Sequence, residues 1–226
     1  MGILIAITVI LAWIGHLAYT LLYVPADFSS VWFYVHILIQ GYLFTGLFIT
    51  GHDAMHGTVS ENHTVNQITG WIASLLFAGL LYNKLIKNHG LHHMYPGTEK
   101  DPDFYVKSQN FFRWFFVFMY RYVTIWQLLI MAAAYNILLI WFDDKNLVFF
   151  FFFSSLMGTL QMFYFGVWIP HRLPHEKDMK PYNARTQKKN HLWAMLSCYF
   201  FGYHYEHHHS PRTPWWKLYK TKANYD

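Results

Sequence analysis

Four long apolar segments constrain the fold more than any other feature of this sequence. They cover residues 3–24, 31–50, 123–142 and 147–169. A helix needs about 20 apolar residues to cross a bilayer, and each segment reaches that length. Only 13% of the residues are charged and 54% are apolar, which is unusual for a soluble globular domain. The sequence therefore predicts one all-α integral membrane domain over residues 1–226, with four transmembrane helices arranged as two helical hairpins.

The polar regions between and after these hairpins are expected to form a helical, histidine-rich cap from residues 51–122 and 170–226. Within the cap, the apolar segment 68–82 has about 15 residues, which is short for a membrane span. We expect it to be re-entrant or interfacial and to return to the same side. Segment 111–120 is aromatic and flanked by arginines, as in a helix that lies at the membrane interface.

The distribution of basic residues predicts the orientation. The two cap segments hold 6 and 10 of the 17 Lys and Arg residues, and Lys145 is the remaining one on the opposite side. Basic residues are enriched in the cytoplasmic loops of membrane proteins. We therefore expect an integral protein of the cell inner (cytoplasmic) membrane, with both termini and the cap in the cytoplasm.

Eight of the fifteen histidines fall into three short groups in this cap. One group has histidines at positions i and i+4, and the other two have them at i, i+3 and i+4, so each group places its imidazoles on one face of a helix. Imidazole is the commonest side-chain metal ligand. The eight residues are His52 and His56, His89, His92 and His93, and His204, His207 and His208.

Eight imidazoles exceed the four ligands of a tetrahedral zinc ion and suit two metal ions. The sequence contains one Glu-x-x-His stretch, Glu206 to His209, whereas carboxylate-bridged di-iron bundles use two, and it lacks the His-Glu-x-x-His motif of zinc proteases. Its single cysteine, Cys198, excludes a cysteine-type zinc site and an iron–sulfur cluster. Four acidic residues in or near the groups are expected to orient imidazoles: Asp53, Asp101, Asp103 and Glu206.

Other polar residues are expected to have structural roles. His16 and His36 lie inside the first hairpin, where we expect hydrogen bonds between helices, with substrate contact as the alternative. We also expect interhelical hydrogen bonds from the three amides inside the later spans, which are Gln127, Asn136 and Gln161. The histidines without a matching spacing are His63, His191 and His209.

The three histidine groups, interleaved with two hairpins, resemble the membrane fatty-acid desaturase and hydroxylase superfamily. The flanking residues resemble one branch of it, the bacterial-type β-carotene ketolases. The matching stretches span most of the chain: GHDAMHG at 51–57, HHMYPG at 92–97, DPDF at 101–104, PHR at 170–172, NAR at 183–185, and HYEHH at 204–208 with Pro211.

This resemblance implies a centre of two ferrous ions, with O2 as co-substrate, held by the eight grouped histidines. It also implies a ninth ligand, His171, because superfamily members place a further histidine just after the last span. His175 ranks lower, since Pro174 breaks the helical link. The implied activity is oxidation of the allylic C4 methylene of β-ionone rings of β-carotene to a ketone, giving echinenone and canthaxanthin.

The chain shows no fingerprint for a flavin, nicotinamide or haem. The expected partners are therefore an external, ferredoxin-like electron donor, a carotenoid substrate in an apolar tunnel and the lipid bilayer; no nucleic acid is expected. A fatty-acyl desaturase or hydroxylase with the same irons is the alternative, distinguished by channel shape. A metal transporter is disfavoured, because transport sites lie near the bilayer midplane.

Overall fold

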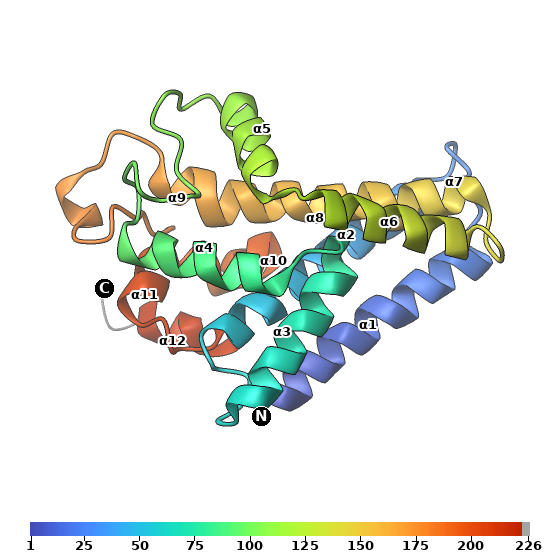
Figure 1. Cartoon of the computed structure of the whole chain (residues 1–226), viewed down its shortest axis with the longest axis horizontal. Helices are drawn as coiled ribbons and strands as arrows, with labels where there is room; N and C mark the ends of the chain where they lie inside the picture. The colour runs from blue at the N-terminus through green and yellow to red at the C-terminus, as the bar shows by residue number, and fades with distance from the viewer. Residues whose placement is uncertain (223–226) are drawn as a thin grey trace.

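The computed structural model describes residues 1–222, and every regular element in that range is a helix (Figure 1). The first hairpin consists of α1 (Gly2–Tyr23) and α2 (Val31–Met55), of 22 and 25 residues. Both are long and apolar enough to cross a membrane. α2 continues without a break into the first histidine group.

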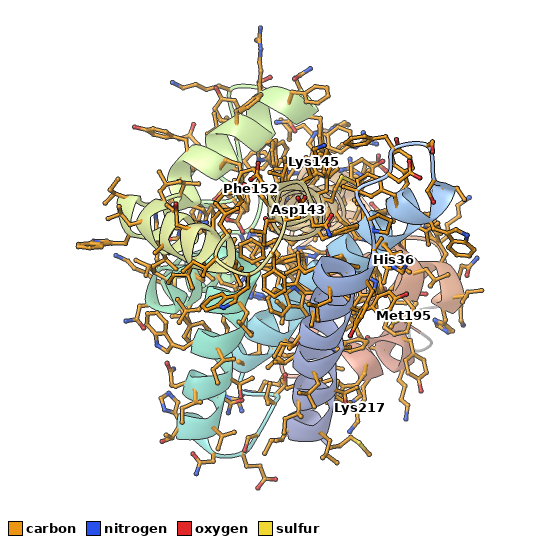
Figure 2. All side chains as sticks on the ribbon, turned by 90° about the vertical axis from the view of Figure 1, so that its right-hand side faces the viewer. His36, Asp143, Lys145, Phe152, Met195 and Lys217 are labelled. Carbon is orange, nitrogen blue, oxygen red and sulfur yellow. The ribbon has the colours of Figure 1, made fainter. Side chains whose placement is uncertain are left out.

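A third helix of this length runs from Asp144 to His171 and has 28 residues. It begins where the Asp143 side chain accepts the backbone N–H groups of Lys145 and Asn146. Figure 2 shows Asp143 and Lys145 together at this end of the helix. Its consecutive segments are α7 (Asp144–Asn146), the π-helical η1 (Leu147–Phe153), α8 (Ser154–Phe163), the π-helical η2 (Tyr164–Trp168) and α9 (Ile169–His171).

The predicted span 123–142 is not one long helix. It is α6 (Ile125–Leu138), of 14 residues, which bends by 89° from α5 (Phe111–Tyr122). Thr124 is the reason for the break, because its side chain caps a new helix by accepting the N–H of Gln127. Apolar length alone could not reveal this turn. The structure thus contains three helices long enough to span, or up to five spans if each bent pair of helices counts as one.

A second bent pair consists of α3 (His63–Ala78) and α4 (Tyr82–Met94), which meet at 101°. Gly79 ends α3 in the left-handed conformation, with φ of 65°, which glycine adopts at little cost. The segment 68–82, expected to be re-entrant or interfacial, therefore contains a turn of about a right angle. The turn brings α4, with its histidine group, back alongside the end of α2.

α2 is the central helix and packs against α1, α3 and α8. A Cβ atom at Gly158 of α8 would lie only 2.9 Å from the carbonyl oxygen of Gly41, so small residues permit this contact. Polar side chains join the helices only in part as expected: Gln161 bonds Thr45 of α2, but the Asn136 amide donates to Ala132 of its own helix. His16 lies 2.5 Å from the Gln40 oxygen and 3.1 Å from a nitrogen of His36.

Two helices expose large apolar and aromatic side chains on their outer faces. α5 buries Trp114 and Phe118 and exposes Phe116 and Tyr120, so its interfacial position stays a prediction. α10 (His191–Cys198) follows the same pattern near the C-terminus. The rest of the cap consists of η3 (Lys177–Met179), α11 (His204–His209), η4 (Trp215–Lys217) and α12 (Leu218–Lys222).

Candidate metal centre

The nine histidines predicted as ligands form two adjoining clusters. In each cluster the ring nitrogens that could bind a metal lie within 4.8 Å of one another. The five-histidine cluster consists of His52, His56, His89, His93 and His207. The four-histidine cluster consists of His92, His171, His204 and His208.

The helical spacing explains how three sequence groups supply two clusters. On α4, His89 and His93 share one face and enter the five-histidine cluster, whereas His92 is rotated off that face and enters the other. α11 does the reverse, since His204 and His208 enter the four-histidine cluster. Each His-x-x-His-His group therefore lies between two sites and contributes to both.

In the five-histidine cluster the ring nitrogens converge. The Nε2 atoms of His56 and His89 are 2.7 Å apart, and those of His93 and His207 are 3.0 Å apart. His52 is buried, and neither of its ring nitrogens has a hydrogen-bond partner within residues 1–222. Metal–nitrogen bonds of about 2.1 Å at right angles place neighbouring ligand atoms about 3 Å apart. The cluster therefore has the spacing and the free lone pairs that a metal ion requires.

The four-histidine cluster is completely buried. The Nε2 atom of His208 lies 3.1 Å from the Nε2 atoms of both His92 and His204. His171 donates from Nδ1 to the carbonyl oxygen of Asn183 at 3.0 Å, while its Nε2 has no partner in the described part of the chain. That bond fixes the tautomer whose free lone pair is on Nε2. This cluster, too, fits a metal ion.

The histidines of α11 are in the correct protonation state for this role. Burial, together with the neighbouring imidazoles, lowers the pKa values of His204, His207 and His208 well below the ordinary value. The rings are therefore neutral at pH 7. Neutral imidazole is the form that binds metal ions, so no proton needs to be displaced.

Two of the four predicted acidic residues lie beside His92. Asp101 accepts from His92 Nδ1 at 3.0 Å and is held in place by the backbone N–H of Gly97 at 2.8 Å. Asp103 lies 3.8 Å from the same ring nitrogen, and its carboxylate accepts the hydroxyl of Tyr122. A carboxylate on the outer nitrogen of a histidine fixes the ring orientation, which is the role expected for these residues.

The other two acidic residues have different surroundings. Asp53 lies 3.8 Å from Nδ1 of His52, beyond hydrogen-bond distance. Glu206 accepts the Thr186 hydroxyl at 2.7 Å and forms a buried ion pair with Lys222 at 3.3 Å. These contacts connect α11 to the loop before α10 and to the C-terminal helix.

Two groups that hold the residues around the histidine clusters were not predicted from the sequence. One is the main-chain carbonyl of Asn183, because a backbone acceptor leaves no side-chain signature; only its place in a family-like stretch was a signal. The other is the side chain of Tyr122, which bonds Asp103 and to which no role was assigned at the end of the cap segment 51–122. The remaining histidines lie outside both clusters: His16, His36, His63, His175, His191 and His209.

An apolar cavity of about 230 Å³ reaches the five-histidine cluster. It lies among α2, the α3–α4 bend, α5, α6 and the long helix that contains α8. His89 and Asp103 form part of its wall, and most of the rest is phenylalanine, leucine and methionine. The centre therefore has an apolar approach from the membrane-embedded part of the protein.

Comparison with known proteins agrees with this arrangement. The sequence model of the fatty acid desaturase family matches residues 29–129 and 121–225. The chain belongs to the fatty acid desaturase family.

Within the desaturase family, the extensive similarities are to carotenoid enzymes. A β-carotene ketolase from a Paracoccus species is 33% identical over 96% of this chain and 90% of its own length. A zeaxanthin 4-ketolase from Chlamydomonas reinhardtii is 34% identical over 98% of this chain, which spans only 53% of the algal protein. These matches confirm the resemblance to the ketolase branch.

The similarity to a desaturase acting on lipids is more limited. An sn-1 acyl-lipid omega-3 desaturase from Synechocystis is 36% identical over 39% of this chain. No solved structure matches the chain.

Proposed function

We propose that this membrane protein is a carotenoid 4-ketolase, which oxidises the allylic C4 methylene of a β-ionone ring to a ketone with O2. The observation that carries the proposal is the cavity whose apolar walls end at His89 and Asp103. A hydrocarbon ring entering from the membrane would meet the five-histidine cluster there. The similarity to β-carotene ketolases over nearly the whole chain supports this substrate class.

The nine clustered histidines would hold two iron ions, five at one ion and four at the other. When bound, the iron pair supplies the activation of O2, which no side chain can perform. The chain contributes the arrangement around it. His92 is oriented by Asp101, and His171 by the carbonyl of Asn183.

The cavity positions the substrate and excludes water. Phe118, Phe152 and Met131 are among the apolar side chains on its wall. Its volume of about 230 Å³ is on the scale of one end ring rather than a whole carotenoid. The polyene would therefore extend from the cavity into the lipid, with the reacting ring held innermost.

Two oxidations of the same carbon give the ketone. The first replaces a C4 hydrogen with a hydroxyl group, and the second produces a geminal diol that loses water. Each oxidation consumes one O2, two electrons and two protons and releases one water molecule. The chain needs an external donor for these electrons, and we propose a ferredoxin-like protein that docks on the basic cap.

The relative exposure of the two clusters supports electron entry from the cap side, at the five-histidine cluster. His56, His89 and His93 are only partly buried, whereas all four residues of the other cluster are buried. A second cavity, of about 260 Å³, is lined by these three histidines together with Met55, Ile86, Gly90 and Pro211 of the cap. Electrons would enter the five-histidine cluster through this opening.

We further propose that the protein resides in the cytoplasmic membrane with its cap in the cytoplasm. The concentration of 16 of the 17 Lys and Arg residues in the two cap segments supports this orientation.

Pigment analysis tests the proposed function. A bacterium that accumulates β-carotene and supplies a ferredoxin system would be grown in air with and without this chain. Products with one or two ring ketones, identified by mass and by a red-shifted absorption spectrum, are expected. If the pigment stays unchanged while the protein is present in the membrane, the ketolase assignment is wrong. New double bonds or hydroxyl groups in the lipid fraction would then establish the desaturase or hydroxylase alternative.

A further inference from the structure

One polar side chain in the cavity is left without a partner. Gln127, in the first turn of α6, lines the apolar cavity and is only 8% exposed. Its Oε1 atom has no hydrogen-bond partner within residues 1–222. It is the only cavity-lining side chain in that range with such an unpaired buried atom.

The other polar groups on the wall are already engaged. The hydroxyl of Tyr122 donates to Asp103. The hydroxyl groups of Ser155 and Thr159 donate to carbonyl oxygens of their own helix, at 2.7 and 2.9 Å. Gln127 therefore stands apart as an amide whose Oε1 atom is not satisfied by any group in residues 1–222.

The position of Gln127 is fixed by its backbone. Its N–H donates to the Thr124 side chain at 3.1 Å. A Cβ atom at Gly79, in the α3–α4 bend, would lie 3.3 Å from the Gln127 carbonyl oxygen and 3.0 Å from Ile130. The first turn of α6 is thus packed closely against that bend, and Gln127 lines the cavity from this turn.

An unpaired buried amide is costly, and a ligand that supplies the missing partner recovers that cost. A hydroxyl group is the suitable partner in an apolar cavity, because it both donates and accepts and so matches either end of the amide. No charged group other than Asp103 lines the cavity among the described residues, so nothing there would balance a charged ligand.

We propose that Gln127 is a specificity-determining residue that hydrogen-bonds a hydroxyl group on the end ring bound in the cavity. This inference rests on the proposed ketolase function. The cavity holds about one ring, so the hydroxyl group belongs to the ring being oxidised. It has two sources: a substituent already present on the substrate ring, or the alcohol that the first oxidation installs.

Replacing Gln127 by Leu tests the inference. Membranes with wild-type or variant enzyme, a ferredoxin system and O2 would receive β-carotene or a carotenoid with 3-hydroxylated β-rings. Leucine removes the amide but preserves most of its volume. If the substrate supplies the hydroxyl group, the ratio of kcat/KM for the hydroxylated ring to that for the plain ring falls at least about tenfold in the variant.

If the hydroxyl group that Gln127 binds is instead the alcohol produced by the first oxidation, the expected result is different. In that case the Gln127→Leu enzyme acting on β-carotene releases the 4-hydroxy ring in place of the ketone. Asn136→Leu is the matched control, because it makes the same change on α6 at an exposed residue whose amide bonds only its own helix. This control should retain the wild-type ratio and products.

Both variants would be checked for their amount in the membrane and for bound iron, and Gln127→Met would replace Gln127→Leu if the latter failed to accumulate. A Gln127 variant with the wild-type ratio and no released alcohol would refute the inference. So would a proportional loss of both activities. If the wild-type enzyme oxidised neither carotenoid, the proposed function itself would fail, which is a separate outcome.

Discussion

Asp101 and His92 form a buried pair in which the carboxylate accepts from Nδ1 of the imidazole at 3.0 Å. The other nitrogen of the ring, Nε2, is thereby turned toward His208, 3.1 Å away. The loop after α4 thus determines the direction in which a histidine on α4 points. The same carboxylate also accepts the backbone N–H of Asp103, so the loop and the ring are held as one unit.

Replacing Asp101 by Asn should weaken metal binding at the four-histidine cluster. The amide no longer provides a negative charge for Nδ1–H, and loss of such a partner typically lowers metal affinity about 10–100-fold. Iron bound per purified chain, titrated against a competing chelator, measures the effect. Asp178→Asn, an exposed change in the same cap, is the control. Equal iron affinity in the two variants would contradict the orienting role.

His207 is expected to be indispensable, whereas its near neighbour His209 is not. His207 is buried in the five-histidine cluster, and His209 is exposed and outside both clusters. His207→Ala should abolish ketone formation and reduce bound iron, by more than the loss of an outer partner would. His209→Ala should leave both within about twofold of wild type, since surface substitutions usually have small effects. Turnover and iron content in the same membranes make the comparison, and a fully active His207→Ala enzyme would disprove the ligand assignment.

The contact between α2 and α8 should not tolerate a side chain at Gly158. A Cβ atom there would lie 2.9 Å from both the Gly41 carbonyl oxygen and the Phe44 Cβ. Gly158→Ala should therefore destabilise the protein by about 1–3 kcal/mol. Thermal unfolding in detergent provides the measurement. Gly15→Ala on α1 is the matched control, because an added Cβ there has no neighbour within 4 Å. It should be neutral or stabilising.

The orientation can be tested by labelling. Lys145 and Lys100 are both exposed, and the proposed topology puts them on opposite sides of the membrane. In intact cells a membrane-impermeant maleimide should label Lys145→Cys but not Lys100→Cys. Lysis should expose both. The only native cysteine, Cys198, is buried and should remain unlabelled in the unmodified protein. Labelling of Lys100→Cys in intact cells would show that the cap faces the outside and that the proposed orientation is wrong.

The sequence predicts the long helices and the grouping of eight histidines well, because both are local patterns, whereas His171 was expected only from the family resemblance. Three of the four apolar segments are long helices, and the histidine spacings imply shared faces. It could not predict how the faces meet. Helical spacing separates His89 from His92 on α4, but the partners that each of them meets depend on the 101° bend between α3 and α4, where Gly79 ends α3. The break at Thr124 is a capping effect hidden inside an apolar segment.

α2 is a single helix from Val31 to Met55, so the part that lies in the lipid and the part that carries His52 are one rigid rod. Any adjustment of the helix to the thickness of the bilayer, by tilting or by shifting along its axis, moves His52 with it. The position of His52 relative to the histidines of α4 and α11 therefore depends on the thickness of the surrounding membrane. Lipid chain length, which determines bilayer thickness, would therefore change the geometry of the histidine clusters.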